Sequence, residues 1–213
     1  MTSSRTPAIV ENSRSNGVAT DEAIVSGNLV GGTWIVDGGS VGAQLSIGTS
    51  AITTNSGTVI LRGSAANFSN LVSGSKATLR TNAGFLTYEA GAGARLDNLR
   101  NTGTLTVGLG SSVNVVRSDS LVSGELREGT WMVQGSAGTP SSLIVGASTS
   151  AITSNSASVV LHGAGAQFGQ LTGLVTNAGS LSLLGGQVFT AGALVNTGTI
   201  VIDDASQLLT TKS

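Results

Sequence analysis

The stretch Asn101-Thr102-Gly103-Thr104-Leu105-Thr106-Val107 recurs as Asn196-Thr197-Gly198-Thr199-Ile200-Val201-Ile202, with the first four residues identical. In both copies an Asn-x-Gly turn precedes a run in which apolar and small polar residues alternate, the pattern of a strand with one buried face. Four further stretches follow this scheme, one with alanine in place of glycine, and the asparagines of the six copies are Asn55, Asn82, Asn101, Asn155, Asn177 and Asn196. A turn and a strand repeated roughly every 20 residues are typical of a β-solenoid.

Alternation within the repeated strands predicts which residues face the core. If the residue after Asn-x-Gly is position zero, positions one and three are apolar in all six copies, for example Leu105 and Val107. Neighbouring residues of a strand point to opposite faces, so we expect these apolar residues to form one buried column. Positions zero and two are mostly small and polar and are expected to face outward. The candidate interaction face made by these outward residues comprises Thr58, Thr87, Thr104, Thr106, Ser158, Ser180, Ser182 and Thr199.

The repeated asparagines and glycines fall at the bends between strands. Glycine and asparagine tolerate positive φ, which tight bends often require, so we expect that backbone conformation at these corners. Asparagine side chains stacked in successive turns can hydrogen-bond to one another along a rod. We therefore interpret the six asparagines as a structural corner ladder and not as a ligand-binding array.

A longer repeat divides the chain into two halves of one continuous solenoid. Gly32-Thr33-Trp34-Ile35-Val36 matches Gly129-Thr130-Trp131-Met132-Val133, so residues 21–117 form the first copy and residues 118–213 the second. Residues 1–20 are either an N-terminal tail or a degenerate capping rung.

The strand pattern predicts an all-β fold, a single-stranded parallel β-helix of about ten rungs. Gly interrupts every window and good helix formers are sparse, so helices are not expected. An antiparallel β-sandwich is the alternative, because it also contains many short strands.

The composition excludes several classes of partner. Charged residues make up 10% of the chain, the net charge is −1 and there are seven aromatic residues, so neither a basic stripe nor a stacking platform for nucleic acid is visible. There is no cysteine to supply a thiolate metal site. No apolar run reaches about 18 residues, so no transmembrane helix is predicted. The stretch Met1–Pro7 has no apolar signal-peptide core, and we expect the chain to be a piece of a longer exported protein.

The candidate catalytic residues do not form a recognisable set. His162 is the only histidine and has no nucleophile or orienting partner nearby in sequence, so we interpret it as a solvated turn residue. The candidate carboxylates are scattered along the chain. They are Asp37, Glu89, Asp97, Asp119, Glu125, Glu128, Asp203 and Asp204. We therefore predict no enzymatic activity, no catalytic residues, no cofactor and no metal site.

The aromatic residues are assigned by the same strand count. Trp34 and Trp131 occupy inward positions, whereas Phe85 occupies an outward one. Phe68, Phe168 and Phe189 are expected to fill the core.

The Asn-Thr-Gly-Thr-Leu-Thr-Val runs and the Gly-x-Gly-Ser corners over about residues 21–213 resemble the passenger repeats of bacterial autotransporter and filamentous-haemagglutinin-like surface proteins. The resemblance implies a right-handed parallel β-helix and an extracellular or cell-surface rod. It carries over no functional residue, because the shared motif is structural.

Three functions follow as hypotheses. The first is a non-enzymatic structural or adhesive β-solenoid segment that associates end to end or contacts surface glycans or proteins. The second is a glycan-binding or polysaccharide-degrading β-helix. The third is an ice-binding solenoid, for which the outward Thr and Ser column would be the binding face.

Overall fold

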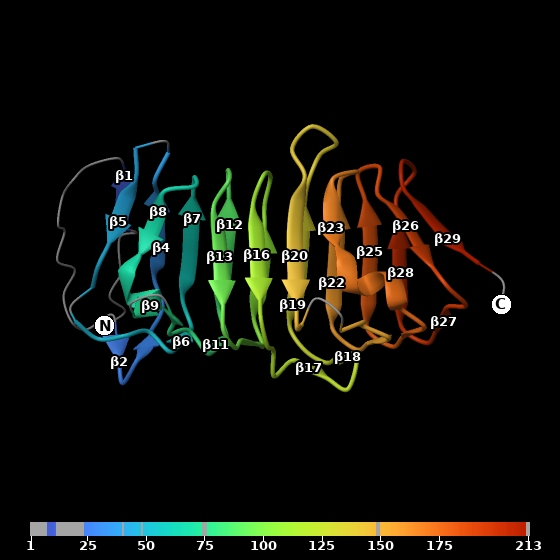
Figure 1. Ribbon diagram of the computed structural model, residues 1–213, viewed down its shortest axis with the longest axis horizontal. Helices are drawn as coiled ribbons and strands as arrows, with labels where there is room; N and C mark the ends of the chain where they lie inside the picture. Colours follow the sequence, from blue (N-terminus) through green and yellow to red (C-terminus); the bar gives the residue numbers. More distant parts are fainter. Residues whose placement is uncertain are drawn as a thin grey trace, which may run out of the picture.

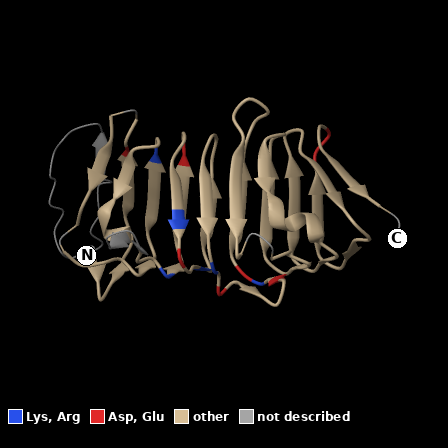
Figure 2. Cartoon of the chain, viewed as in Figure 1, with Lys and Arg blue, Asp and Glu red and all other residues tan. Residues whose placement is uncertain are grey.

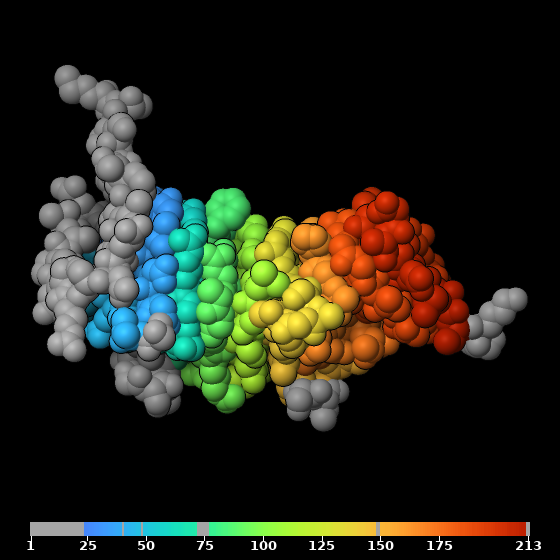
Figure 3. Space-filling model, turned by 90° about the horizontal axis from the view of Figure 1, so that it is seen from above, coloured from blue at the N-terminus to red at the C-terminus, as the bar shows by residue number. Residues whose placement is uncertain are grey.

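The computed structural model describes residues 8–11, 24–39, 41–47, 49–73, 76–147 and 150–211. Strands account for 51% of the structure and helices for 4%, so the prediction of an all-β fold is confirmed. The strands stack along the long axis of an elongated body, from blue to red in Figure 1. Successive stretches of chain form bands across that axis in the space-filling view (Figure 3).

A nine-stranded sheet runs along this body, and all its neighbouring strands pair in parallel. Strands adjacent in this sheet are separated in sequence by short strands of the other sheets. The nine strands, in spatial order, are β1 (Ala8–Glu11), β4 (Thr33–Asp37), β7 (Thr58–Arg62), β12 (Phe85–Glu89), β15 (Thr104–Val107), β19 (Thr130–Gln134), β22 (Ser158–His162), β25 (Ser180–Leu184) and β28 (Thr199–Ile202).

Two five-stranded sheets of two-residue strands contain the corner asparagines. The first is β14 (Arg100–Asn101), β11 (Thr81–Asn82), β6 (Thr54–Asn55), β3 (Asn28–Leu29) and β2 (Ile24–Val25). The second is β17 (Leu121–Val122), β18 (Glu125–Leu126), β21 (Ser154–Asn155), β24 (Thr176–Asn177) and β27 (Val195–Asn196).

The remaining strands form smaller sheets. A four-stranded parallel sheet contains β13 (Gly93–Leu96), β16 (Ser112–Val115), β20 (Ser141–Val145) and β23 (Ala166–Phe168). Two-stranded sheets pair β5 (Ala43–Leu45) with β8 (Ala66–Phe68), β26 (Val188–Ala191) with β29 (Gln207–Thr210), and β9 (Val72–Ser73) with β10 (Lys76–Ala77). The 3₁₀ helices η2 (Ser69–Leu71) and η3 (Gly169–Gly173) follow β8 and β23.

The direction of pairing decides between the two predicted architectures. Among the described strands, antiparallel pairing is limited to three pairs of two-residue strands, β2–β3, β9–β10 and β17–β18. An antiparallel sandwich would need antiparallel pairing throughout its sheets. The stacked parallel sheets are instead compatible with a β-solenoid.

Pairing in the long sheet continues across the boundary between the two long repeats. Thr104 to Val107 of β15 pair in register with Thr130 to Val133 of β19. At the other end, β1 pairs in register with β4, from Ala8 opposite Trp34 to Glu11 opposite Asp37. The rest of residues 1–20 lies outside the described residues.

The predicted inward column forms the core. Its members at positions one and three are buried in five of the six Asn-marked strands, from Val59 and Leu61 to Leu181 and Leu183. In β28 the column emerges from the core, because Ile202 is 42% exposed. The other predicted core aromatics are also buried, namely Trp34, Trp131, Phe68, Phe168 and Phe189.

The expectation of positive φ at the Asn-x-Gly corners is wrong. None of Gly57, Gly84, Gly103, Gly179 and Gly198 is among the described residues with positive φ, and neither is any of the six asparagines. Glycine is favoured at these five positions for a different reason, which is the closeness of the stacked turns. A Cβ on Gly84 would lie 2.0 Å from the carbonyl oxygen of Gly57, and one on Gly103 would lie 2.1 Å from that of Gly84.

Candidate functional site

The six corner asparagines form two separate ladders of three. In the first, Asn55 Nδ2 donates to Asn82 Oδ1 and Asn82 Nδ2 donates to Asn101 Oδ1, both at 2.8 Å. In the second, Asn155 Nδ2 donates to Asn177 Oδ1 at 2.8 Å and Asn177 Nδ2 donates to Asn196 Oδ1 at 2.7 Å.

Five of the six asparagine amides, all but that of Asn196, also bond to the backbone of a neighbouring turn. Asn82 Nδ2 donates to the carbonyl of Thr104 at 2.9 Å, and Asn101 Nδ2 donates to the carbonyl of Thr130 at 2.9 Å. All the asparagines except Asn196 have no solvent-accessible surface. Buried amides with this many partners stabilise the backbone bends and leave little capacity to bind a ligand.

Leucine holds the asparagine position in the two turns that contain tryptophan. Leu29 pairs in register with Asn55, and Leu126 pairs in register with Asn155. Both leucines are fully buried. Each lies next to the first asparagine of a ladder, and because leucine has no side-chain amide, it adds no polar group that would need a partner. The repeat boundary is therefore also the interruption between the two ladders.

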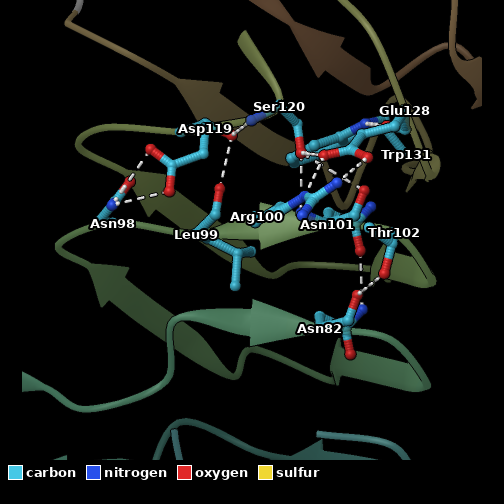
Figure 4. Close-up of polar contacts among 11 residues, drawn as sticks. Asn82, Asn98, Leu99, Arg100, Asn101, Thr102, Asp119, Ser120, Glu128 and Trp131 are labelled. Atoms are coloured by element: carbon cyan, nitrogen blue, oxygen red, sulfur yellow. Dashed lines mark hydrogen bonds and ion pairs between the residues drawn. The ribbon is translucent and has the colours of Figure 1, made fainter. Parts of the chain in front are cut away.

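A polar network joins the end of the first ladder to the next turn (Figure 4). The backbone N–H of Asn101 donates to the buried Ser120 Oγ at 2.8 Å. Arg100 makes a two-pronged ion pair with Glu128, from Nε at 2.7 Å and from Nη2 at 3.0 Å. The hydrogen bonds from Arg100 hold the pKa of the Glu128 carboxyl below its usual range. Trp131 Nε1 donates to the backbone carbonyl of Glu128 at 2.9 Å. Glu128 therefore contacts both Arg100 and the tryptophan of the next turn.

The eight candidate Thr and Ser residues lie on the outward side of the nine-stranded sheet. Their alternation with buried residues places them there, and seven of the eight are half-buried, with Thr199 exposed. Strand register extends the position-zero column to two residues that the Asn-x-Gly motif missed, Thr33 and Thr130. Their turns lack the asparagine, but they share the Gly-Thr-apolar order that starts β7, β15 and β28, and this order is a signal that could have found them.

We define the outer face as positions zero and two of the eight strands from β4 to β28. No charged residue occurs among its sixteen members, which are Thr33, Ile35, Thr58, Ile60, Phe85, Thr87, Thr104, Thr106, Thr130, Met132, Ser158, Val160, Ser180, Ser182, Thr199 and Val201.

Hydroxyl groups are unevenly distributed over the outer face. The position-zero column carries a hydroxyl on every strand except β12, where Phe85 is 57% exposed between Thr58 and Thr104. The position-two column is mixed, and hydroxyls fill both columns only on β15 and β25. Two hydroxyls on the same strand therefore occur only on isolated strands, and they do not form a continuous double column along the sheet.

Most charged residues lie at the ends of the strands and in the turns, and Arg95 lies within β13 (Figure 2). At the carboxyl ends, Asp37, Arg62 and Glu89 are in register on adjacent strands, and Arg62 Nε forms an ion pair with Glu89 Oε1. At the amino ends lie the Arg100–Glu128 pair and a second pair, Arg127 Nε with Glu125 Oε2 at 2.9 Å. Charges at both margins leave the centre of the outer face neutral.

His162 is exposed at the end of β22, in register with Gln134 and Leu184. Asp203 accepts a hydrogen bond of 2.6 Å from the N–H of Gly185, and this bond lowers the pKa of the Asp203 carboxyl. Within the described ranges, no group of three or more His, Cys, Asp or Glu side chains could hold a metal ion.

Comparisons of the chain with protein-family models, with curated proteins and with solved structures found no match. Among the residues that the structure describes, no helix has both the length and the apolar character needed to cross a lipid bilayer.

Proposed function

We propose that the chain is a non-enzymatic structural or adhesive segment of a secreted or cell-surface protein, folded as a right-handed parallel β-helix of about ten rungs. One observation carries the proposal: the nine-stranded sheet continues in parallel register along the whole described body above an unbroken apolar column. Nine strands at a spacing of about 4.8 Å give a rod on the order of 40 Å long. Such a rod separates what lies at its two ends by a fixed distance.

The surface of the rod supports an adhesive role. The outer face is broad, neutral and rich in hydroxyl and methyl groups, and it contains the exposed ring of Phe85. Neutral faces of this kind suit contacts with surface glycans or proteins because no charge has to be desolvated. The repeat pattern, which resembles exported passenger repeats, supports an extracellular or cell-surface location.

Location is tested with an antibody raised against the folded chain. We expect it to label intact source cells, or the medium around them, as strongly as permeabilised cells. Labelling that requires permeabilisation would contradict the proposed location.

The adhesive role is tested by coating beads with the chain and measuring their retention on the source organism's own surface and on its extracellular matrix. A Phe85→Thr variant should bind less, and His162→Ser, which changes an exposed residue outside the outer face, is the matched control. Equal retention of coated and uncoated beads would leave a purely structural role.

Association end to end is part of this proposal. Among the described strands, β28 has a neighbour on one side only, and its turn leaves Val195, Val201, Ile202 and Leu209 exposed. Inside the chain, the equivalent strand β15 is covered by the tryptophan strand β19 in full register. A strand of another copy can therefore pair with β28 through the same backbone hydrogen bonds.

A further inference from the structure

The junction between the two long repeats joins the end of the first to the start of the second. Strand β15 pairs with β19 over four residues, from Thr104 opposite Thr130 to Val107 opposite Val133. The strands that follow them, β16 and β20, also pair with each other in parallel register. The chain therefore contains one complete example of a repeat end covered by a repeat start.

The C-terminal end of the body has the same parts as the first half of this junction. Strand β28 starts from the Asn-Thr-Gly-Thr sequence that also starts β15, and β29 follows β28 as β16 follows β15. Among the described strands, β28 and β29 each have a neighbour on one side only. Ile202 and Leu209 are exposed beside these two edges.

The N-terminal end of the body has the same parts as the second half. Gly32 and Gly129 each precede a Thr-Trp pair, and both have a φ of 77°. Trp34 Nε1 donates to the carbonyl of Gly31 at 3.2 Å, and Trp131 Nε1 makes the equivalent bond, to the carbonyl three residues before it, at 2.9 Å. The tryptophan turn therefore has the same conformation in both repeats.

The two tryptophan turns differ in what lies against them. At the internal junction, a Cβ on Gly129 would lie 2.1 Å from the carbonyl oxygen of Asn101, so an asparagine corner packs directly on this glycine. Asn101 Nδ2 also donates to the carbonyl of Thr130 at 2.9 Å. At the N-terminal end, the atoms nearest to a Cβ on Gly32 belong to Trp34 and lie at 3.3 Å or more. This turn is therefore shaped for an asparagine corner that no described residue of the same copy supplies.

Strand β1 covers β4 less completely than β15 covers β19. It pairs with Trp34 to Asp37 and not with Thr33, whereas β15 also pairs with the equivalent Thr130. In the sequence, Pro7 comes immediately before β1, and proline has no N–H to donate to a ladder. No Asn-x-Gly stretch precedes β1. A strand that brings its own asparagine corner would therefore fit β4 better than β1 does.

We propose that copies of this chain assemble head to tail, with β28 of one copy replacing β1 on β4 of the next copy and β29 pairing with β5. This inference rests on the end-to-end association proposed above and specifies its acceptor surface. The internal junction sets the register, which places Ile200 opposite Trp34 and Val201 opposite Ile35. It also gives β5 a second neighbour, since its only described neighbour is β8.

The position of the two surfaces decides the form of the assembly. Strands β1 and β28 lie at opposite ends of the body (Figure 1). Each contact therefore leaves one free surface at either end, and such a heterologous contact can continue as a line of copies. Strand β1 weakens the association, because the apparent Kd rises when only a fraction of the acceptor strands is free.

A disulfide lock on β1 tests the replacement step. The chain has no cysteine, so a variant with Ile9→Cys and Ile35→Cys contains one possible pair, at positions that are in register in β1 and β4. Adjacent strands lie about 4.8 Å apart, which is within the range of a disulfide. Sedimentation velocity is measured over a series of concentrations. We expect the oxidised variant to stay monomeric and the same variant, once reduced, to associate as the wild-type chain does.

Cross-linking between two different variants tests the register. Val201→Cys and Ile35→Cys are made in separate chains, mixed and oxidised, and a disulfide-linked pair of chains is expected as the main product. Thr199→Cys mixed with Ile35→Cys is the matched control, because these positions are two residues out of register. Its Cα atoms would lie beyond about 7 Å, so it should give about tenfold less of the linked product.

Three results would count against the proposal, and they have different meanings. Equal association of the oxidised and reduced forms would show that β4 is not the acceptor, while end-to-end association through another surface would still stand. Equal cross-linking of the two mixtures would reject the register. If neither the wild-type chain nor the reduced variant associates, the end-to-end association itself fails and this inference fails with it.

Discussion

Asn82 Nδ2 lies 2.8 Å from Asn101 Oδ1, and both side chains are completely buried. The bond joins two turns of the chain that are separated by about 20 residues. Asn82 is the central residue of the first ladder, because its Oδ1 also accepts a hydrogen bond from the amide of Asn55. The ladder is therefore a polar chain enclosed in the fold and not a surface feature.

Asn82→Ala should lower the free energy of unfolding by about 2–5 kcal/mol. The substitution leaves a donor of Asn55 and the acceptor of Asn101 without their partner, and each buried unpaired group costs about 1–3 kcal/mol. Asn196→Ala, at the exposed end of the second ladder, is the control and should cost less than half as much. Urea denaturation followed by circular dichroism measures both values. Equal losses at the two positions would show that burial of the ladder contributes nothing.

Gly103→Ala should destabilise the fold by about 1–3 kcal/mol or more, the usual range for overpacking. The new methyl group would lie 2.1 Å from the carbonyl oxygen of Gly84, and only a shift of the backbone can relieve that contact. Gly192→Ala is the matched control, because its methyl group would meet no atom within 4 Å. We expect the control to change stability by less than about 0.5 kcal/mol. Thermal denaturation of both variants tests this, and similar melting temperatures would refute the role assigned to the corner glycines.

Tyr88 should remain protonated in the folded protein well above pH 10. It is the only tyrosine and is buried in β12, and burial raises the pKa of its phenol above the usual value of 10.0. Since the folded pKa is the higher one, the stability gained from a neutral Tyr88 is complete below pH 10 and is lost as the pH rises further. Tyrosinate absorbance near 295 nm should therefore appear together with loss of the circular dichroism signal. Tyrosinate that forms at about pH 10 with the signal intact would contradict this expectation.

The pair of Arg100 and Glu128 should stabilise the protein at neutral pH and lose its effect in acid. The pKa of Glu128 is lowered from 4.5, so this contribution is complete above pH 4.5 and disappears as the pH falls through the lowered value. Glu128→Gln should lower the melting temperature at pH 7 by at most about 4 °C, because exposed pairs are weak. The difference from wild type should shrink as the pH falls below 4.5. A constant difference across this range would assign the effect to packing.

End-to-end association should depend on the exposed apolar residues beside β28. Wild-type protein is expected to show a sedimentation coefficient that rises with concentration. Ile202→Lys combined with Leu209→Lys should abolish this rise, because both side chains are exposed and a lysine there opposes pairing of a further strand. Leu109→Lys, at an exposed position between β15 and β16, is the control. A wild-type protein that stays monomeric at all concentrations would exclude the association.

The sequence alone determined the strands, their inward column and the positions of the corners. Alternation has a period of two wherever one face of a strand is buried, so Leu105 and Val107 could be assigned to the core without coordinates. The exposure of Phe85 and the burial of Trp131 followed from the same count. These features are local, because they depend only on which neighbours along the chain are apolar.

Only the tertiary structure decided what lies between turns. Register placed Thr33 and Thr130 in the outer column, divided the asparagines at Leu126, and showed that Gly103 is needed for a close backbone contact and not for its φ angle. Each of these results concerns residues that are about 20 or more positions apart in the chain. Which of these residues come into contact depends on the loop lengths, and the loop lengths vary from turn to turn.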